Sequence, residues 1–140
     1  MYLVCGEALF DFFARSPEST PTGQVDFKAI AGGSPFNVAV GLRRLGVDTA
    51  LFAGLSTDYL GQRLKQVLVN EGVSTRYLHD LDAPTTLAMV ALDANGSPAY
   101  SFRGEGCADR QLHAHHLPLL GPEVRGVHVG AFSLVVQPVG

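Results

Sequence analysis

Residues 31–46 constrain the fold of this chain more than any other stretch. They form a diglycine turn that runs directly into an apolar helix. Ser34 suits the N-cap, because its hydroxyl can accept from an orphan backbone N–H, and Pro35 suits the first helical position. Gly46 is placed to end the helix in a left-handed conformation. The helix is expected to be buried around most of its circumference, given its apolar residues Phe36, Val38, Ala39, Val40, Leu42 and Leu45.

The two glycines before this helix allow a close approach to the backbone, since neither carries a Cβ. Asn37, in the first helical turn, has an amide that both donates and accepts hydrogen bonds. One interpretation is a hydroxyl-rich ligand that rests on Gly32 and Gly33 and is bound by Asn37. The other is a tight turn before an ordinary buried helix, with Asn37 as a local cap.

The rest of the chain alternates between strand and helix patterns. Short apolar runs predict buried strands at 2–6, 49–54 and 125–130, and alternation predicts a strand with one apolar face at 24–31. A second helix is expected from about 59 to 71, capped by Ser56 or Thr57 and closed by Gly72. This order predicts an α/β fold with a parallel sheet.

A hairpin signal interrupts the alternation. Asn95-Gly96 lies between two β-rich runs, 86–93 and 98–103, and both turn residues tolerate positive φ. We expect this hairpin and the 24–31 strand to form a small antiparallel sheet apart from the main one. One or two short helices are expected within 108–120, around Leu112 and Leu117.

Composition excludes several classes of function. A chain of 140 residues supports one domain with a real core, and its net charge of −3 favours neither a nucleic-acid partner nor a membrane surface. Cys5 and Cys107 are expected to be reduced thiols. No apolar run approaches the length of a membrane span, and Glu7 and Asp11 argue against a secretory leader, so a cytoplasmic location is expected.

Histidines invite a metal interpretation that the spacing does not support. His113 and His116 would share a helical face, but no carboxylate or thiol completes a ligand set beside them, so no metal site is predicted. His128 lies in a buried-strand pattern and is expected to be a core histidine.

Two motifs carry a resemblance to a known family. They are Gly32-Gly33-x-x-x-Asn37-x-Ala39, followed by Gly46, Gly54 and Gly61, and Gly6-Glu7-Ala8-Leu9-x-Asp11. These motifs resemble the N-terminal signature of the PfkB (ribokinase-like) carbohydrate kinases, most closely the fructokinase-type branch. The resemblance implies a ribokinase-like domain whose β-sheet lid has strands near 9–31 and 85–103. It also implies that the chain is the N-terminal part of that domain, truncated before the ATP-binding and catalytic part.

The resemblance also implies a set of sugar-binding residues. Asp11 follows the first strand, where open α/β sheets bind ligands, and a carboxylate can accept two hydroxyls; the alternative is a solvated loop aspartate. In related kinases the residues matching Asp11, Gly33 and Asn37 contact the sugar, and we add Gly32 to this set. Residues matching Phe102 and Arg103 reach the sugar from the lid. The alternatives are lid packing for Phe102 and an ordinary surface charge for Arg103.

No catalytic residue is predicted in this chain. The family's Gly-Ala-Gly-Asp base motif and most of its pocket for ATP and Mg²⁺ belong to the C-terminal half, and no such motif occurs here. Phosphoryl transfer depends on those groups, so the chain is expected to bind a sugar without phosphorylating it. The main sheet is also expected to keep an unpaired edge.

Several functions fit this pattern. The first is the sugar-binding half of an ATP-dependent fructokinase-like enzyme, with a small sugar as ligand and a homodimer through the lid. Within the same family, the substrate could be 2-keto-3-deoxygluconate or a nucleoside. The others are a non-catalytic sugar-binding or dimerisation module, and an unrelated nucleotide-binding α/β module.

Overall fold

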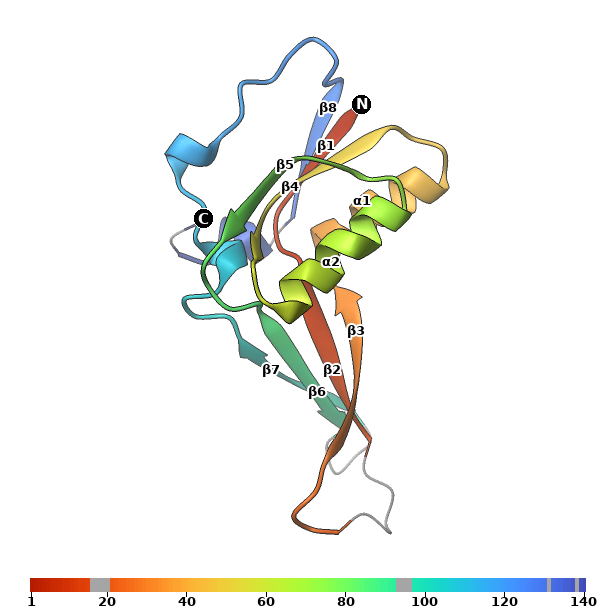
Figure 1. Cartoon of the computed structure of the whole chain (residues 1–140), viewed down its shortest axis with the longest axis vertical. Coiled ribbons are helices and arrows are strands. Elements are labelled where there is room, and N and C mark those ends of the chain that lie inside the picture. Colours follow the sequence, from red (N-terminus) through yellow and green to blue (C-terminus); the bar gives the residue numbers. More distant parts are fainter. Residues whose placement is uncertain (16–20, 93–96, 131, 138) are drawn as a thin grey trace.

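Two four-stranded sheets make up the β structure of the described part of the chain, which a computed structural model gives as residues 1–15, 21–92, 97–130, 132–137 and 139–140 (Figure 1). Sheet A has the strand order β5-β4-β1-β8 and is parallel throughout. Its strands are β1 (Tyr2–Cys5), β4 (Thr49–Ser56), β5 (Ser74–Leu81) and β8 (Gly126–Val129). The predicted parallel α/β sheet is therefore confirmed.

Sheet B has the order β3-β2-β6-β7 and projects from the end of sheet A (Figure 1). Its strands are β2 (Leu9–Arg15), β3 (Asp26–Gly32), β6 (Leu87–Leu92) and β7 (Pro98–Arg103). The prediction of an antiparallel sheet is wrong in one respect: β2 and β6 run parallel, between two antiparallel pairs. The two strands belong to separate hairpins, so no tight turn forces them to run in opposite directions. The predicted Asn95-Gly96 turn lies outside the described residues.

Helices α1 (Ser34–Arg44) and α2 (Tyr59–Asn70) pack on the same face of sheet A (Figure 1). The main core lies between them and the sheet, and β4 at its centre is buried along its whole length. The core residues include Val4, Phe36, Ala39, Leu51, Leu55, Leu64 and Leu68. None of the helices in the described residues is long and apolar enough to cross a membrane.

Helix α1 begins one residue earlier than its sequence suggests. Gly33 occupies the N-cap and Ser34 is the first helical residue, so the prediction that Ser34 caps the helix is wrong. A hydroxyl cap needs extended backbone at its own residue, whereas here the turn is made by Gly33 at φ 103°. The end of the helix is as predicted: Val47 donates to Leu42 O and Gly46 takes φ 80°.

Burial of α1 is confined to one side. Pro35, Phe36, Ala39 and Val40 are buried, whereas Leu45 is 80% exposed, so the prediction of burial around most of the helix is wrong. The physical reason is that the helix contacts sheet A on one face and meets solvent on the other.

Helix α2 is capped by Asp58, not by Ser56 or Thr57 as the sequence suggested. The Asp58 carboxylate accepts from the Gly61 N–H at 2.8 Å and from both the N–H and the hydroxyl of Thr85, at 2.9 and 2.7 Å. One side chain therefore starts the helix and anchors the chain just before β6. Gly72 ends the helix at φ 74°, as predicted.

The C-terminal third of the chain carries two corrections. Among the described residues, strand β8 pairs with β1 alone and is largely exposed. The prediction of a buried strand is therefore wrong, and His128 is a surface residue. The short helices predicted around Leu112 and Leu117 are 3-10 turns at Ala108–Arg110 and Ala114–His116. The predicted unpaired edge of the main sheet is present, because β8 has no second partner strand among the described residues.

Loss of the Asp58 side chain is expected to destabilise the fold by about 1–2 kcal/mol, the usual cost of losing an N-cap. Burial acts to raise the pKa of Asp58, but the hydrogen bonds from Gly61, Thr85 and Ser56 outweigh it and hold this pKa below its ordinary value. This contribution is therefore full above about pH 4 and fades as the pH falls through the lowered pKa. Urea unfolding of Asp58→Ala in the full-length protein measures it, with Thr57→Ala as a control expected to stay near wild type.

Candidate functional site

Asp11 and the diglycine turn are brought together by the pairing of β2 with β3. In this antiparallel register Leu9 lies opposite Gly32 and Asp11 opposite Ile30. A Cβ on Gly32 would overlap the Asp11 carboxylate, so that carboxylate lies directly over the backbone of Gly32. Burial raises the pKa of Asp11 above its ordinary value. The ionised form still offers two acceptor oxygens at the start of the turn.

Gly33 makes the turn itself. Its φ of 103° is strained for any residue with a side chain, and a Cβ there would lie 2.7 Å from the carbonyl oxygen of Glu7. Both glycines are therefore required by close packing within the chain. The tight turn of the second interpretation is therefore present, and the ligand interpretation stays open, because the same turn holds the adjacent polar groups in place.

Asn37 lies one helical turn beyond the diglycine. Its backbone N–H donates to Gly33 O at 2.9 Å, and its side chain is exposed. The helix starts without a side-chain cap, so the alternative role of Asn37 as a local cap does not apply. The structure thus gathers Asp11, Gly32, Gly33 and Asn37 around the N-terminus of α1.

Glu7 is a buried carboxylate in this region that sequence reasoning did not single out. Only 4% of it is exposed, and Ser34 N–H and Ser133 Oγ–H both donate to it, at 3.3 and 2.7 Å. A carboxylate directly after a buried strand was the available signal. Ser133 lies 126 positions away, so the second partner was not visible from the sequence.

Phe102 and Arg103 face opposite ways on β7. The register across sheet B runs from Asp11 to Ala88 and on to Phe102, so the Asp11 and Phe102 side chains share a face. Arg103 lies on the other face and donates to Ser101 Oγ at 2.7 Å. The structure therefore brings Phe102 to the side of the sheet that carries Asp11, and does not bring Arg103 there.

Phe132, just after sheet A strand β8, contacts Phe102 of sheet B. It follows β8 in a 3-10 turn (Phe132–Leu134), and its ring stacks on that of Phe102 with centroids 5.7 Å apart. The Arg110 guanidinium lies 5.3 Å from its ring centroid. An aromatic contact thus joins the two sheets beside the Asp11 face. A single phenylalanine in a weakly patterned segment gave no sequence signal for this contact.

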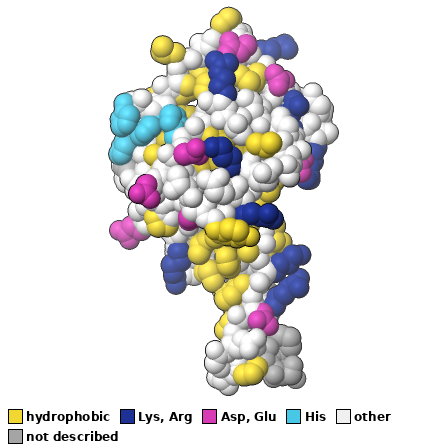
Figure 2. All heavy atoms as spheres, viewed as in Figure 1, with side chains coloured by type: hydrophobic (Ala, Val, Ile, Leu, Met, Phe, Trp, Pro, Cys, Tyr) yellow, Lys and Arg dark blue, Asp and Glu magenta, His cyan; other side chains and the backbone are white. Residues whose placement is uncertain are grey.

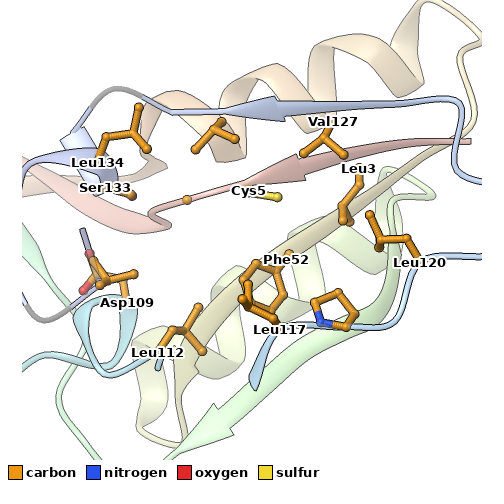
Figure 3. A pocket seen from close by; sticks show the side chains of 14 residues that line it. Leu3, Cys5, Phe52, Asp109, Leu112, Leu117, Leu120, Val127, Ser133 and Leu134 are labelled. Atoms are coloured by element: carbon orange, nitrogen blue, oxygen red, sulfur yellow. The ribbon is translucent and has the colours of Figure 1, made fainter. Parts of the chain in front are cut away.

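A cavity of about 390 Å³ opens on the face of sheet A opposite the helices (Figure 3). Apolar side chains line most of it, some from β1, β4 and β8 and the others from residues 112–120 and from Leu134 and Val139, which lie outside the strands. Asp109 and Ser133 lie together at one end. Thr86 Oγ1 donates to the buried Asp109 carboxylate, and burial raises the pKa of Asp109. A mainly apolar lining does not suit a polyol, so we do not assign the sugar to this cavity.

Four histidines cluster at one flank of the molecule, as Figure 2 shows. His79 on β5 joins His113, His115 and His116, with the rings of His115 and His116 4.0 Å apart. Burial and the neighbouring histidines lower the pKa of His116. Within the described ranges, no three histidine, cysteine, aspartate or glutamate side chains are placed to hold a metal ion.

The fold is an α/β domain with a parallel sheet and a second sheet that meets it at the diglycine turn. The family model for the pfkB family of carbohydrate kinases matches residues 1–133, so the chain belongs to this family. A fructokinase of Rhizobium leguminosarum bv. trifolii is 39% identical over 140 residues, covering all of this chain and 42% of that protein. The probable fructokinase-6 of Arabidopsis thaliana is 33% identical over 98% of the chain and 36% of its own length.

Solved structures agree with the ribokinase-like fold. A fructokinase of Xylella fastidiosa superposes with a TM-score of 0.86 at 31% identity, covering 99% of this chain and 43% of that one. The same enzyme with bound ATP gives 0.85, and the Halothermothrix orenii fructokinase gives 0.78. The chain spans less than half the length of these relatives, so the activity of the whole protein remains a proposal.

Gly33→Ala is expected to destabilise the protein by about 1–3 kcal/mol, because alanine would be strained at this φ and would press on the Glu7 carbonyl. Gly41→Ala is the matched control: it lies inside α1 with open space at its Cβ position, and is expected to be neutral or stabilising by up to about 1 kcal/mol. Urea unfolding of both variants measures the difference. Equal stabilities would show that the turn tolerates a side chain.

Proposed function

We propose that the full-length protein containing this chain is an ATP-dependent sugar kinase, and that this chain supplies its sugar-binding part. The observation that carries the proposal is the Asp11 carboxylate held against Gly32, at the turn whose Gly33 carbonyl accepts from the Asn37 N–H, in a chain of the carbohydrate kinase family. The relatives named as fructokinases make fructose the first substrate to test.

Asp11 and Asn37 would bind the sugar from two sides of the turn. An ionised Asp11 accepts hydrogen bonds from two hydroxyls, and such charge-assisted bonds are roughly twice as strong as neutral ones. The Asn37 amide both donates and accepts, which suits a hydroxyl in either role. Gly32 and Gly33 would leave room for the sugar close to the backbone.

Sheet B would act as a lid, with strands near 9–31 and 85–103 in a single ribokinase-like domain. Phe102 is 46% exposed on the face that carries Asp11, where it could cover the sugar and exclude water. Arg103 lies on the opposite face of sheet B, so its side chain would have to reach past the end of β7 to contact the same ligand. Its guanidinium is therefore the weakest member of the proposed set.

The phosphoryl donor would be ATP with Mg²⁺, which screens the phosphate charges when bound. An ATP-bound fructokinase among the similar structures supports the nucleotide. We propose that the nucleotide site and the catalytic base come from the rest of the full-length protein. This chain would bind and orient the sugar hydroxyl.

Two accompanying proposals concern context. A homodimer through the lid would cover apolar side chains that sheet B exposes, among them Phe13, Phe27 and Ile30. A cytoplasmic location suits Cys5 and Cys107, which are unpaired thiols. Burial raises the pKa of Cys5 to about 11, which keeps that thiol protonated and unreactive.

Asp11→Asn and Asn37→Ala in the full-length protein are each expected to lower kcat/KM for the sugar by about ten- to a hundredfold, through loss of hydrogen bonds to hydroxyls. The KM for ATP should stay within about twofold. Asp80→Asn is the carboxylate control, because Asp80 pairs with Lys65 at the surface of β5. Because only ionised Asp11 accepts two hydroxyls, wild-type kcat/KM should fall as the pH drops through its raised pKa, and Asp11→Asn should lack this fall.

ADP release measured with fructose, 2-keto-3-deoxygluconate, ribose and adenosine identifies the substrate. Turnover with one sugar supports the kinase, and turnover with adenosine favours a nucleoside kinase of the same family. Sugar binding by calorimetry with no turnover would instead support a non-catalytic module. An absence of both binding and turnover with every compound would refute the proposal.

A further inference from the structure

Glu7 joins three segments that are far apart in the sequence. Its carboxylate accepts from Ser34 at the start of α1 and from Ser133 after β8, while Glu7 itself follows β1. We propose that Glu7 is a positioning residue for sugar recognition, which fixes the diglycine turn relative to Asp11. This inference rests on the proposed function and adds a residue that does not itself touch the sugar.

The start of α1 depends on this carboxylate because its own N-cap is a glycine. Gly33 has no side chain with which to cap the helix, and no side-chain cap bond forms from that position. Glu7 takes over from outside the helix by accepting the Ser34 N–H, where the helix dipole also favours a negative charge. A substitution at Glu7 is therefore expected to loosen the turn through the loss of this hydrogen bond.

Pro35, in the first turn of α1, packs closely against Gly6 and Gly130. A Cβ on Gly6 or on Gly130 would overlap the Pro35 ring, so the ends of β1 and β8 both contact the first turn of α1. The same hypothetical Cβ on Gly6 would lie 3.0 Å from Ser133 Oγ. The first turn of α1 thus packs closely against the ends of β1 and β8, and the Glu7 hydrogen bonds join the same three segments.

The connection to the sugar residues is short on both sides of Glu7. Asp11 follows four residues later on β2, and Gly33 precedes the hydrogen-bonded Ser34 directly. Asn37 follows one turn later, bonded to Gly33 O. The Glu7 carboxylate therefore sets how far the Asp11 carboxylate lies from the Asn37 amide. A misplacement of about 1 Å between groups that grip one ligand can cost about a hundredfold in rate.

The test compares Glu7→Ala with Glu7→Gln in the full-length protein, using two readouts. Hydrogen exchange at the backbone amides of Gly33, Ser34, Phe36 and Asn37 reports whether the turn is held. The KM for the sugar, compared with the KM for ATP, reports whether that matters for recognition. Glu7→Ala should speed exchange at these amides and raise the sugar KM about tenfold or more, with the ATP KM within about twofold. Glu7→Gln keeps an acceptor oxygen and the volume, and should restore most of both.

Leu68→Ala is the control for destabilisation, because Leu68 lies on the buried face of α2, in the main core and outside the site. It should lower the melting temperature and leave the sugar KM unchanged. If Glu7→Ala cannot be purified, Ser133→Ala removes one of the two donors and should raise the sugar KM by about threefold.

Unchanged exchange at the backbone amides of the turn would overturn the inference whatever the activity. An unchanged sugar KM in a folded Glu7→Ala or Ser133→Ala variant, beside an active wild type, would overturn the role of Glu7 and leave the proposed function standing. A wild type that turns over no sugar would instead contradict the proposed function, and with it the sugar role of Glu7. Equal rises in the KM for sugar and for ATP would indicate a general loss of structure and would also overturn it.

Discussion

The close approach of backbone and carboxylates at the diglycine turn is the constraint on which the other features depend. Glycine is required at position 32 because the Asp11 carboxylate occupies the space of a Cβ. It is required at position 33 because the Glu7 main chain occupies that space. These contacts join the last residue of β3 to the start of α1. They hold sheet B, the helix and the candidate sugar residues together.

Two further carboxylates secure the other connections between the sheets. Asp58, at the start of α2, accepts from Thr85, which lies just before β6. Asp109, which follows β7, accepts from Thr86. Each pair ties a segment that enters or leaves sheet B to the body around sheet A. Hydrogen bonds to charged groups contribute more than neutral ones, so these carboxylates are effective anchors where the chain passes between the two sheets.

The sequence predicted the elements well where hydrophobic periodicity decides them. Strands β1 and β4, both helices and the two glycine-closed helix ends agree with expectation. Strand β5 was missed because its residues, Ser74–Leu81, are mixed polar and apolar and only Tyr77 is fully buried. Strand β8 looked buried because a short apolar run is the same at the centre and at the edge of a sheet.

The site was only partly predictable for a related reason. Asp11 and the diglycine follow from motifs, but their contact comes from the β2–β3 register, which the sequence did not predict. Glu7 with Ser133, and Phe102 with Phe132, join distant parts of the chain, which one sequence does not reveal. The opposite orientation of Arg103 depends on a strand register that the motif does not contain.

A crystal structure of the full-length protein with fructose bound tests the central claim most directly. We predict fructose hydroxyls within hydrogen-bond distance of the Asp11 carboxylate and of the Asn37 amide, beside Gly33 and beneath the Phe102 ring. Fructose bound elsewhere, with Asp11 and Asn37 both facing solvent, would contradict the account.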